Sequence, residues 1–210
     1  MKHVRPHFVF NQLGDKDRMV TMSLPFQHSV TSMIERAVLL TLVKLVEPKR
    51  IFEFGTYLGE MTRMFAENTE AQIFTLDLGH GCTSEKLDGF EQKNLAKGIE
   101  QGRLYADRPY RGRITELFGD STMFNFRPYE GSMDFILIDG GHHIDVVRKD
   151  TENAFQLCSR SGKRCIVWHD YGNPEYEITE YLDRLSEDYP LVHVEDTKYV
   201  YWFDDASSCG

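Results

Sequence analysis

The sequence lacks the features of several classes of protein. No block of lysine and arginine is longer than a pair, and the formal net charge of the 210 residues is -9. Because nucleic-acid binding needs a basic surface, we expect no nucleic-acid partner. No run approaches the roughly 20 apolar residues that span a bilayer, and no apolar segment follows the first residues. We therefore expect a cytoplasmic protein with no membrane partner, which acts on small molecules.

Cysteine is scarce as well. None of the four cysteines stands in a Cys-x-x-Cys pair, and Cys158 and Cys165 lie in apolar stretches. A thiol in such surroundings behaves as a small hydrophobic group. We expect the cysteines to be reduced and structural.

Short apolar segments alternate with segments of helical character, which is typical of a doubly wound α/β sheet. Ser32 to Glu35 has the form of a capping box and predicts a helix that ends before Pro48. Two β-rich runs near the end predict an antiparallel hairpin. The expected strands are 51–54, 72–76, 114–118, 133–138 and 164–168, the hairpin is 191–194 with 199–203, and the further helices lie at 59–68, within 85–100, at 144–157 and at 175–186.

The turn after the first expected strand contains two glycines, Gly55 and Gly59, in the spacing Glu-x-Gly-x-x-x-Gly. Glycines let a backbone approach a ligand closely, and a helix that starts there points N–H groups at it. The dinucleotide pattern Gly-x-Gly-x-x-Gly is absent, because Tyr57 stands where its second turn glycine is expected. A cofactor without a pyrophosphate fits better. The segment resembles motif I of the class I S-adenosylmethionine (SAM) dependent methyltransferases.

The resemblance implies a Rossmann-like, mostly parallel, seven-stranded sheet with a C-terminal antiparallel hairpin. It divides the chain into an N-terminal arm or lid (1–28), a SAM-binding methyltransferase domain (29–205) and a tail (206–210). The long stretch 79–113 lies where such excursions often shape a substrate site. Its Arg108, Arg111 and Arg113 either attract an anionic substrate or belong to a solvated loop.

The same resemblance implies a set of cofactor contacts. Glu53 would orient the amino-acid end of SAM, and the turn would pass beneath it. Asp77 follows Gly55 by 22 residues, which suits a carboxylate that accepts from ribose hydroxyls, although a plain turn aspartate is the alternative. Asp120 would accept from the adenine amino group, or Gly-Asp-Ser is an ordinary turn. The complete expected set is Glu53, Gly55, Thr56, Tyr57, Gly59, Asp77, Asp120, Ser121 and Asp139.

The densest polar cluster follows the fourth and fifth strands, as Asp139-Gly-Gly-His-His143 and Trp168-His-Asp-Tyr171. Ligands of an open α/β sheet bind outside the carboxyl ends of its strands, so we expect these segments to meet there. Carboxylates and imidazoles together suit a divalent metal. A metal that lowers the pKa of a substrate hydroxyl, with an imidazole as base, would perform O-methyl transfer.

Both segments resemble those of the metal-dependent small-molecule O-methyltransferases related to macrocin O-methyltransferase and the cephalosporin hydroxylase-like proteins. The resemblance implies that Asp139 and Asp170 bind the metal and that His142 is the general base. His169 stands where that family often has a glutamate, so the sequence leaves open magnesium, manganese, iron, zinc or no metal. His143 has the alternative of capping the next helix.

Several hypotheses stay open at this point. The leading one is SAM-dependent methylation of a small-molecule hydroxyl. The alternatives are a SAM-using enzyme that does not methylate, for example by SAM cyclisation, a NAD-dependent oxidoreductase, and a non-catalytic SAM-binding module. Tyr57, Trp168 and Tyr171 either line the cleft or belong to the core. The sequence names no acceptor and leaves a homo-oligomer open.

Overall fold

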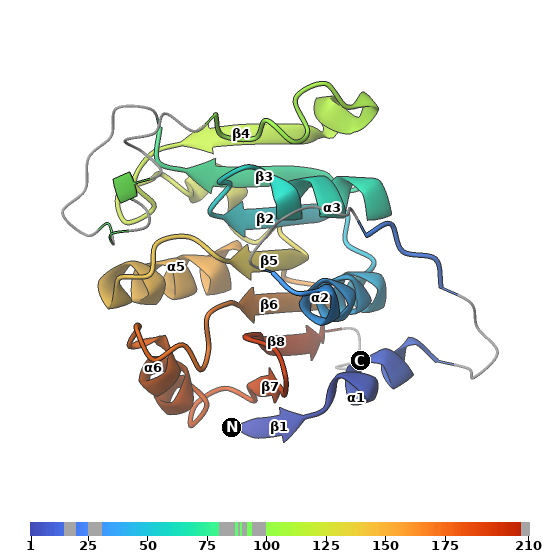
Figure 1. Ribbon diagram of the computed structural model, residues 1–210, viewed down its shortest axis with the longest axis vertical. Coiled ribbons are helices and arrows are strands. Elements are labelled where there is room, and N and C mark those ends of the chain that lie inside the picture. Colours follow the sequence, from blue (N-terminus) through green and yellow to red (C-terminus); the bar gives the residue numbers. More distant parts are fainter. Residues whose placement is uncertain are drawn as a thin grey trace.

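The computed structural model describes residues 1–14, 20–24, 31–79, 87, 89, 92–93 and 100–206, and an eight-stranded sheet forms its centre (Figure 1). The strand order is β1-β7-β8-β6-β5-β2-β3-β4. Every neighbouring pair is parallel except the two pairs that β8 makes, with β6 and with β7. The strands are β1 (Lys2–Val4), β2 (Arg50–Phe54), β3 (Gln72–Asp77), β4 (Ile114–Phe118), β5 (Phe135–Ile138), β6 (Lys163–Trp168), β7 (Val192–Val194) and β8 (Val200–Asp205). The predicted doubly wound sheet with a reversed final strand is confirmed.

Helices cover both faces of the sheet. Successive residues of a buried strand point to opposite faces, so Ile51 joins the core under α2 and α3 while Phe52 joins the core under α5 and α6. The helices are α1 (Pro6–Phe10), α2 (Met33–Val46), α3 (Glu60–Asn68), α5 (Ile144–Leu157) and α6 (Ile178–Leu185), with short 3-10 turns at Asn11–Leu13, Pro109–Arg113 and Arg127–Tyr129.

The predicted elements agree with these bounds. The capping box is present, because the Ser32 hydroxyl accepts from the Glu35 N–H (3.3 Å) and the Glu35 carboxylate accepts from the Ser32 N–H (2.7 Å). The helix predicted at 175–186 is shorter than expected and begins at Ile178. Most of the segment within 85–100, where a further helix is expected, lies outside the described residues.

The start of the chain differs from the expectation of an irregular arm. Lys2–Val4 forms an eighth strand beside β7, and Val9 of α1 is fully buried in the core under α2. A strand of three residues is too short to show an alternating pattern, although backbone bonds and the contact of His3 with His193 hold it against β7. The sheet therefore has eight strands where the sequence predicted seven.

Two cysteines fall within the described residues. Cys158 and Cys165 are both buried and free, as expected. None of the described helices has the length and apolar character needed to cross a membrane.

Candidate functional site

Residues 55–59, here called the cofactor turn, connect β2 to α3. Gly55 has a φ of +92°, and a Cβ added to it would lie 2.2 Å from the backbone oxygen of Asp139. A Cβ on Gly59 (φ +81°) would lie 2.3 Å from the ring of Tyr105. Both positions therefore need glycine because other parts of the chain come so close. That a cofactor also lies against them stays a prediction.

Asp77 at the end of β3 holds the cofactor turn. One carboxylate oxygen accepts from the N–H groups of Thr56 (2.9 Å) and Tyr57 (2.8 Å), and the other accepts from the N–H of Leu78 (2.7 Å). Burial raises the pKa of this carboxyl group. Tyr57, which is held in this way at a φ of 46°, has 43% of its surface exposed. Asp77 thus fixes the turn at the place where ribose binding is predicted.

Glu53 lies beneath the turn and is 1% exposed. One oxygen of its carboxyl group accepts from the hydroxyl groups of Thr62 and Thr75, the latter at 2.7 Å. Burial raises the pKa of Glu53 to about 8, although these hydroxyl bonds act in the opposite direction. In this arrangement Glu53 links β2 to α3 and β3 on either side of the turn, and a contact with SAM stays a prediction.

The Gly-Asp-Ser segment after β4 forms a local turn. Asp120 accepts from the N–H (2.8 Å) and the hydroxyl (2.7 Å) of Thr122. The backbone oxygen of Ser121 accepts from the side chain of Asn153 on α5 (3.3 Å). These bonds fit the ordinary-turn alternative, and the adenine contacts remain predictions.

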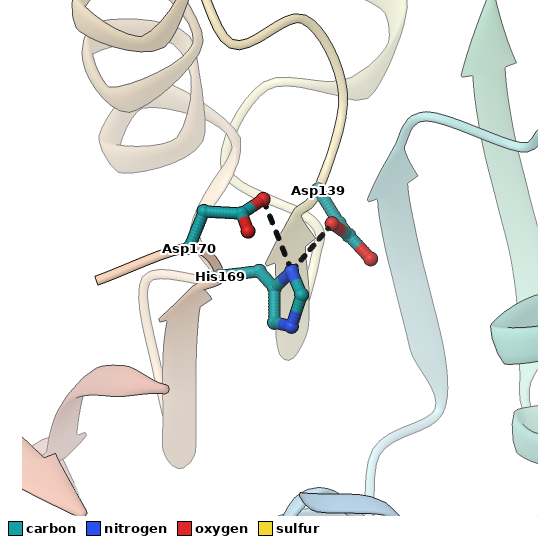
Figure 2. A group of neighbouring side chains, drawn as sticks. All are labelled: Asp139, His169 and Asp170. Carbon is teal, nitrogen blue, oxygen red and sulfur yellow. Dashed lines mark hydrogen bonds and ion pairs between the residues drawn. The ribbon is translucent and has the colours of Figure 1, made fainter. Parts of the chain in front are cut away.

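Asp139, His169 and Asp170 lie together at the carboxyl ends of β5 and β6 (Figure 2). His169 Nδ1 is 3.0 Å from Asp139 Oδ1 and 3.2 Å from Asp170 Oδ2. The predicted convergence of the two strand ends is therefore observed. These residues also line a small hollow, together with Ile138, Gly140, Gly141, His142, Val147, Trp168 and Ile178.

The two histidines after β5 have different surroundings. His142 Nε2 lies 3.2 Å from Asp170 Oδ2, and its ring stacks on Tyr176 with centroids 4.4 Å apart. His143 is the N-cap of α5, where its Nδ1 accepts from the N–H of Asp145 (3.3 Å). His142 thus belongs to the site, while His143 takes the capping alternative. We call Asp139, His142, His169 and Asp170 the reacting cluster.

Two residues that the sequence did not assign to the site contact the cluster. Lys198 Nζ in the β7–β8 turn lies 3.4 Å from Asp170 Oδ1, and Glu35 Oε1 in α2 lies 3.7 Å from His169 Nε2. Lys198 is thus a basic partner of Asp170 that the sequence did not indicate. Glu35 was recognised only as part of a capping box, and no local spacing marks either residue as part of the site.

Charge organises the reacting cluster. Burial alone would lower the pKa of His169, but Asp139, Asp170 and Glu35 raise it well above its usual value. Burial would raise the pKa of Asp170, yet its bonds to His142 and His169 lower it. Burial likewise opposes ionisation of Glu35, whereas His169 and the N–H groups of Ser32 and Lys198 lower its pKa to about 2. The carboxylates of Asp139, Asp170 and Glu35 therefore stabilise a positively charged group that lies between them.

The donor set fits a divalent cation. Asp139, His169 and Asp170 each offer a ligand atom, and these atoms lie within 4.8 Å of one another. Adjacent ligands on a cation with bonds of about 2.1 Å lie about 3 Å apart, which matches the two measured N···O distances. One imidazole and two carboxylates suit manganese, iron or zinc.

The remaining candidates have structural surroundings. Trp168 is fully buried, and its Nε1 donates to the Thr151 hydroxyl (2.9 Å). Arg111 donates to the Ile114 carbonyl and pairs with Glu116. Arg113 donates to carbonyls at and after the end of α3, those of Ala66, Thr69 and Ala71. Trp168 therefore belongs to the core and also lines the hollow, whereas the solvated-loop alternative does not describe Arg111 and Arg113, whose side chains bond to the protein.

Comparison with solved structures shows that several methyltransferases share this fold. Similar structures include a provisionally assigned caffeoyl-CoA O-methyltransferase from Staphylococcus aureus, with 12% identity over 83% of this chain and 84% of that one, and a TM-score of 0.59. The O-methyltransferase TomG from Streptomyces achromogenes shares 15% identity over 83% and 80% of the chains (TM-score 0.55). A methyltransferase from Geobacter sulfurreducens shares 14% over 84% and 80% (TM-score 0.55).

Family membership follows from the sequence. Residues 52–171, more than half of the chain, match the model of a methyltransferase-domain family, and the chain belongs to that family. A search of curated proteins found no match. The protein is a SAM-dependent methyltransferase of class I, and the NAD-dependent alternative is thereby set aside.

Proposed function

We propose that the protein transfers the methyl group of SAM to a hydroxyl group of a small molecule, with a divalent cation held by Asp139, His169 and Asp170. The observation that carries this proposal is the convergence of three ligand atoms within 4.8 Å at the ends of β5 and β6. The printed names of two similar structures, both O-methyltransferases, support the choice of a hydroxyl acceptor.

In the proposed mechanism His142 accepts the proton of the acceptor hydroxyl. Its Nε2 lies 3.2 Å from Asp170 Oδ2, so the imidazolium that forms faces a carboxylate and is stabilised by it. A cation bound by the three ligands would lower the pKa of the acceptor hydroxyl. The cofactor turn and the hollow beside the cluster would align acceptor, methyl group and sulfur, which is the main contribution that methyl transfer asks of a protein.

The test is transfer of a labelled methyl group from SAM to a panel of alcohols and phenols, with magnesium, with manganese and with a chelator. We expect labelled ethers from the parent protein and a decrease of about 10²-fold or more in His142→Gln. His143→Gln is the matched control, because it removes a neighbouring histidine that caps α5, and it should retain the parent rate.

Four outcomes would contradict parts of the proposal. Equal rates in His142→Gln and the parent would remove His142 as the base. A labelled amine as product would exclude the hydroxyl acceptor. Consumption of SAM with no methylated acceptor would favour the non-methylating alternative, and rates unaffected by the chelator would remove the metal.

A further inference from the structure

Glu35 approaches the reacting cluster from the side opposite the aspartates. It lies in the first turn of α2, outside the residues that match the family model, and is 5% exposed. Its Oε1 is 3.7 Å from Nε2 of His169. Nδ1, on the other side of the same ring, faces Asp139 and Asp170 (Figure 2). The His169 ring therefore lies between the Glu35 carboxylate on one side and the Asp139 and Asp170 carboxylates on the other.

Two backbone N–H groups, which lie far apart from each other in the sequence, fix the Glu35 carboxylate. One oxygen accepts from the N–H of Ser32 (2.7 Å), and the other accepts from the N–H of Lys198 in the β7–β8 turn (3.0 Å). Both donors belong to the backbone, so the carboxylate position does not depend on a flexible side chain. A carboxylate held in this way can set the orientation of a neighbouring ring.

Nε2 of His169 requires such a neighbour. The His169 side chain is 7% exposed, and within the described residues its Nε2 has no hydrogen-bond partner at normal length. An imidazole that gives the lone pair of Nδ1 to a cation keeps its proton on Nε2, and a buried proton of this kind needs an acceptor. Glu35 Oε1 is the charged acceptor that faces it, and a small approach of the ring would close the 3.7 Å gap.

We propose that Glu35 is a positioning residue of the reacting cluster, whose carboxylate accepts from His169 Nε2 and so keeps Nδ1 turned toward Asp139 and Asp170. The role of Nδ1 as a metal ligand rests on the proposed function. The orientation of the ring does not, and it can be measured separately.

The decisive comparison is Glu35→Gln against Ser32→Ala. Glu35→Gln removes the charge and keeps the shape of the side chain. Ser32→Ala removes the hydroxyl half of the capping box but leaves the Glu35 carboxylate and the Ser32 N–H in place. It therefore reports what loss of the helix cap alone does. Calorimetric binding of SAM and thermal unfolding show whether each variant is folded.

The first readout is titration with Co²⁺, followed by calorimetry and by the visible absorption of the bound ion. We expect Glu35→Gln to lower Co²⁺ affinity about 10- to 100-fold and to change the absorption band. Ser32→Ala should bind Co²⁺ as the parent does, and both variants should retain the parent affinity for SAM. An equal loss of Co²⁺ affinity in the two variants would overturn the proposal, because the helix cap would explain it.

The second readout needs no metal. In ¹⁵N-histidine-labelled protein, the signals of His169, assigned with His169→Gln, report which nitrogen carries the proton and how strongly it is bonded. We expect the Nε2 signal to move in Glu35→Gln and to stay in Ser32→Ala. If the parent binds no Co²⁺ but this signal moves, the metal part of the proposed function fails and the positioning role stands. An unmoved signal overturns the positioning role.

Discussion

The cofactor turn is held by groups that lie close to it in the folded β2–α3–β3 unit, whereas the reacting cluster is held by charges from four separate parts of the chain. Asp77 and Glu53 accept from backbone N–H groups and from threonine hydroxyls. In the reacting cluster, carboxylates face His142, His169 and Lys198. The turn is thus held by uncharged donors, whereas the cluster is an ionic assembly of groups that lie far apart in the sequence.

The comparison indicates a division of labour. Hydrogen bonds from uncharged donors fix a backbone shape and change little with the ligand that binds. Paired charges are sensitive to any proton or cation that enters between them, because the interaction between charges is strong where water is excluded. The two regions should therefore respond differently to substitution and to pH.

The largest effect is expected where the two regions touch, at Gly55. Gly55→Ala places a methyl group 2.2 Å from the Asp139 carbonyl at a φ of +92°, so the cofactor turn and the end of β5 must separate. We expect a loss of unfolding free energy on the order of 3 kcal/mol or more, and loss of SAM binding. Denaturant unfolding and calorimetry measure both.

Gly162→Ala is the control for Gly55→Ala. Gly162 also has a positive φ (77°), but a Cβ there has no atom within 4 Å. It should lose only about 1 to 2 kcal/mol of backbone strain and retain SAM binding. Equal losses in the two variants would show that strain, and not the close approach to Asp139, makes Gly55 necessary.

The next effect separates the two regions. Asp170→Asn removes the carboxylate that faces His142, His169 and Lys198, so we expect methyl transfer to fall by about 10²-fold, which is on the order of 2.7 kcal/mol. SAM affinity, which we predict to depend on the cofactor turn, should change little. Single-turnover transfer and calorimetry measure the two quantities.

Asp145→Asn is the matched control for Asp170→Asn and should retain the parent rate. Asp145 lies in the first turn of α5, and 57% of its side chain is exposed. A parallel loss of SAM affinity in Asp170→Asn would contradict the separation of the two regions.

The most gradual effect is a pH dependence carried by Glu53, because it is spread over several pH units. The pKa of Glu53 is raised from 4.5 to about 8 by burial, so between these values the folded protein holds a proton that the unfolded chain has released. This contribution to stability is complete below about pH 4.5 and is lost as the pH rises through about 8. The expected slope is at most about 1.4 kcal/mol per pH unit.

Glu53→Gln imitates the protonated carboxyl group and should flatten this part of the stability profile between pH 5 and 8. Glu152→Gln, whose side chain is 62% exposed on α5, should leave the slope as it is in the parent. Urea unfolding at several pH values provides the measurement. An unchanged slope in Glu53→Gln would mean that another group carries the dependence.

The sequence predicted the fold well because the fold depends on local patterns. Buried strands appear in the sequence as short apolar runs, and the capping box at Ser32 correctly predicted the start of α2. The three-residue strand β1 was missed because too few side chains alternate in it. Strand pairing of this kind depends on a partner that lies about 190 residues away.

The site was predicted in part for the same reason. Strand ends of one sheet edge can be placed from topology, so the meeting of Asp139 with His169 and Asp170 was foreseen. Glu35 and Lys198 reach the cluster through tertiary packing, and neither has a spacing that indicates it. The sequence left open whether Asp77 binds a ligand or the turn itself, because a carboxylate at a strand end has the same sequence signal whether it faces a ligand or a backbone amide.

The reversed strand β8 has a consequence for how the site can change. Because β8 runs antiparallel to both its neighbours, the turn between β7 and β8 lies at the same edge of the sheet as the reacting cluster, where Lys198 contacts Asp170. Surface turns accept insertions and replacements that buried strand ends do not tolerate. Residues 195–197 are therefore a natural position for grafting a different loop next to the chemistry while Lys198 and the sheet stay in place.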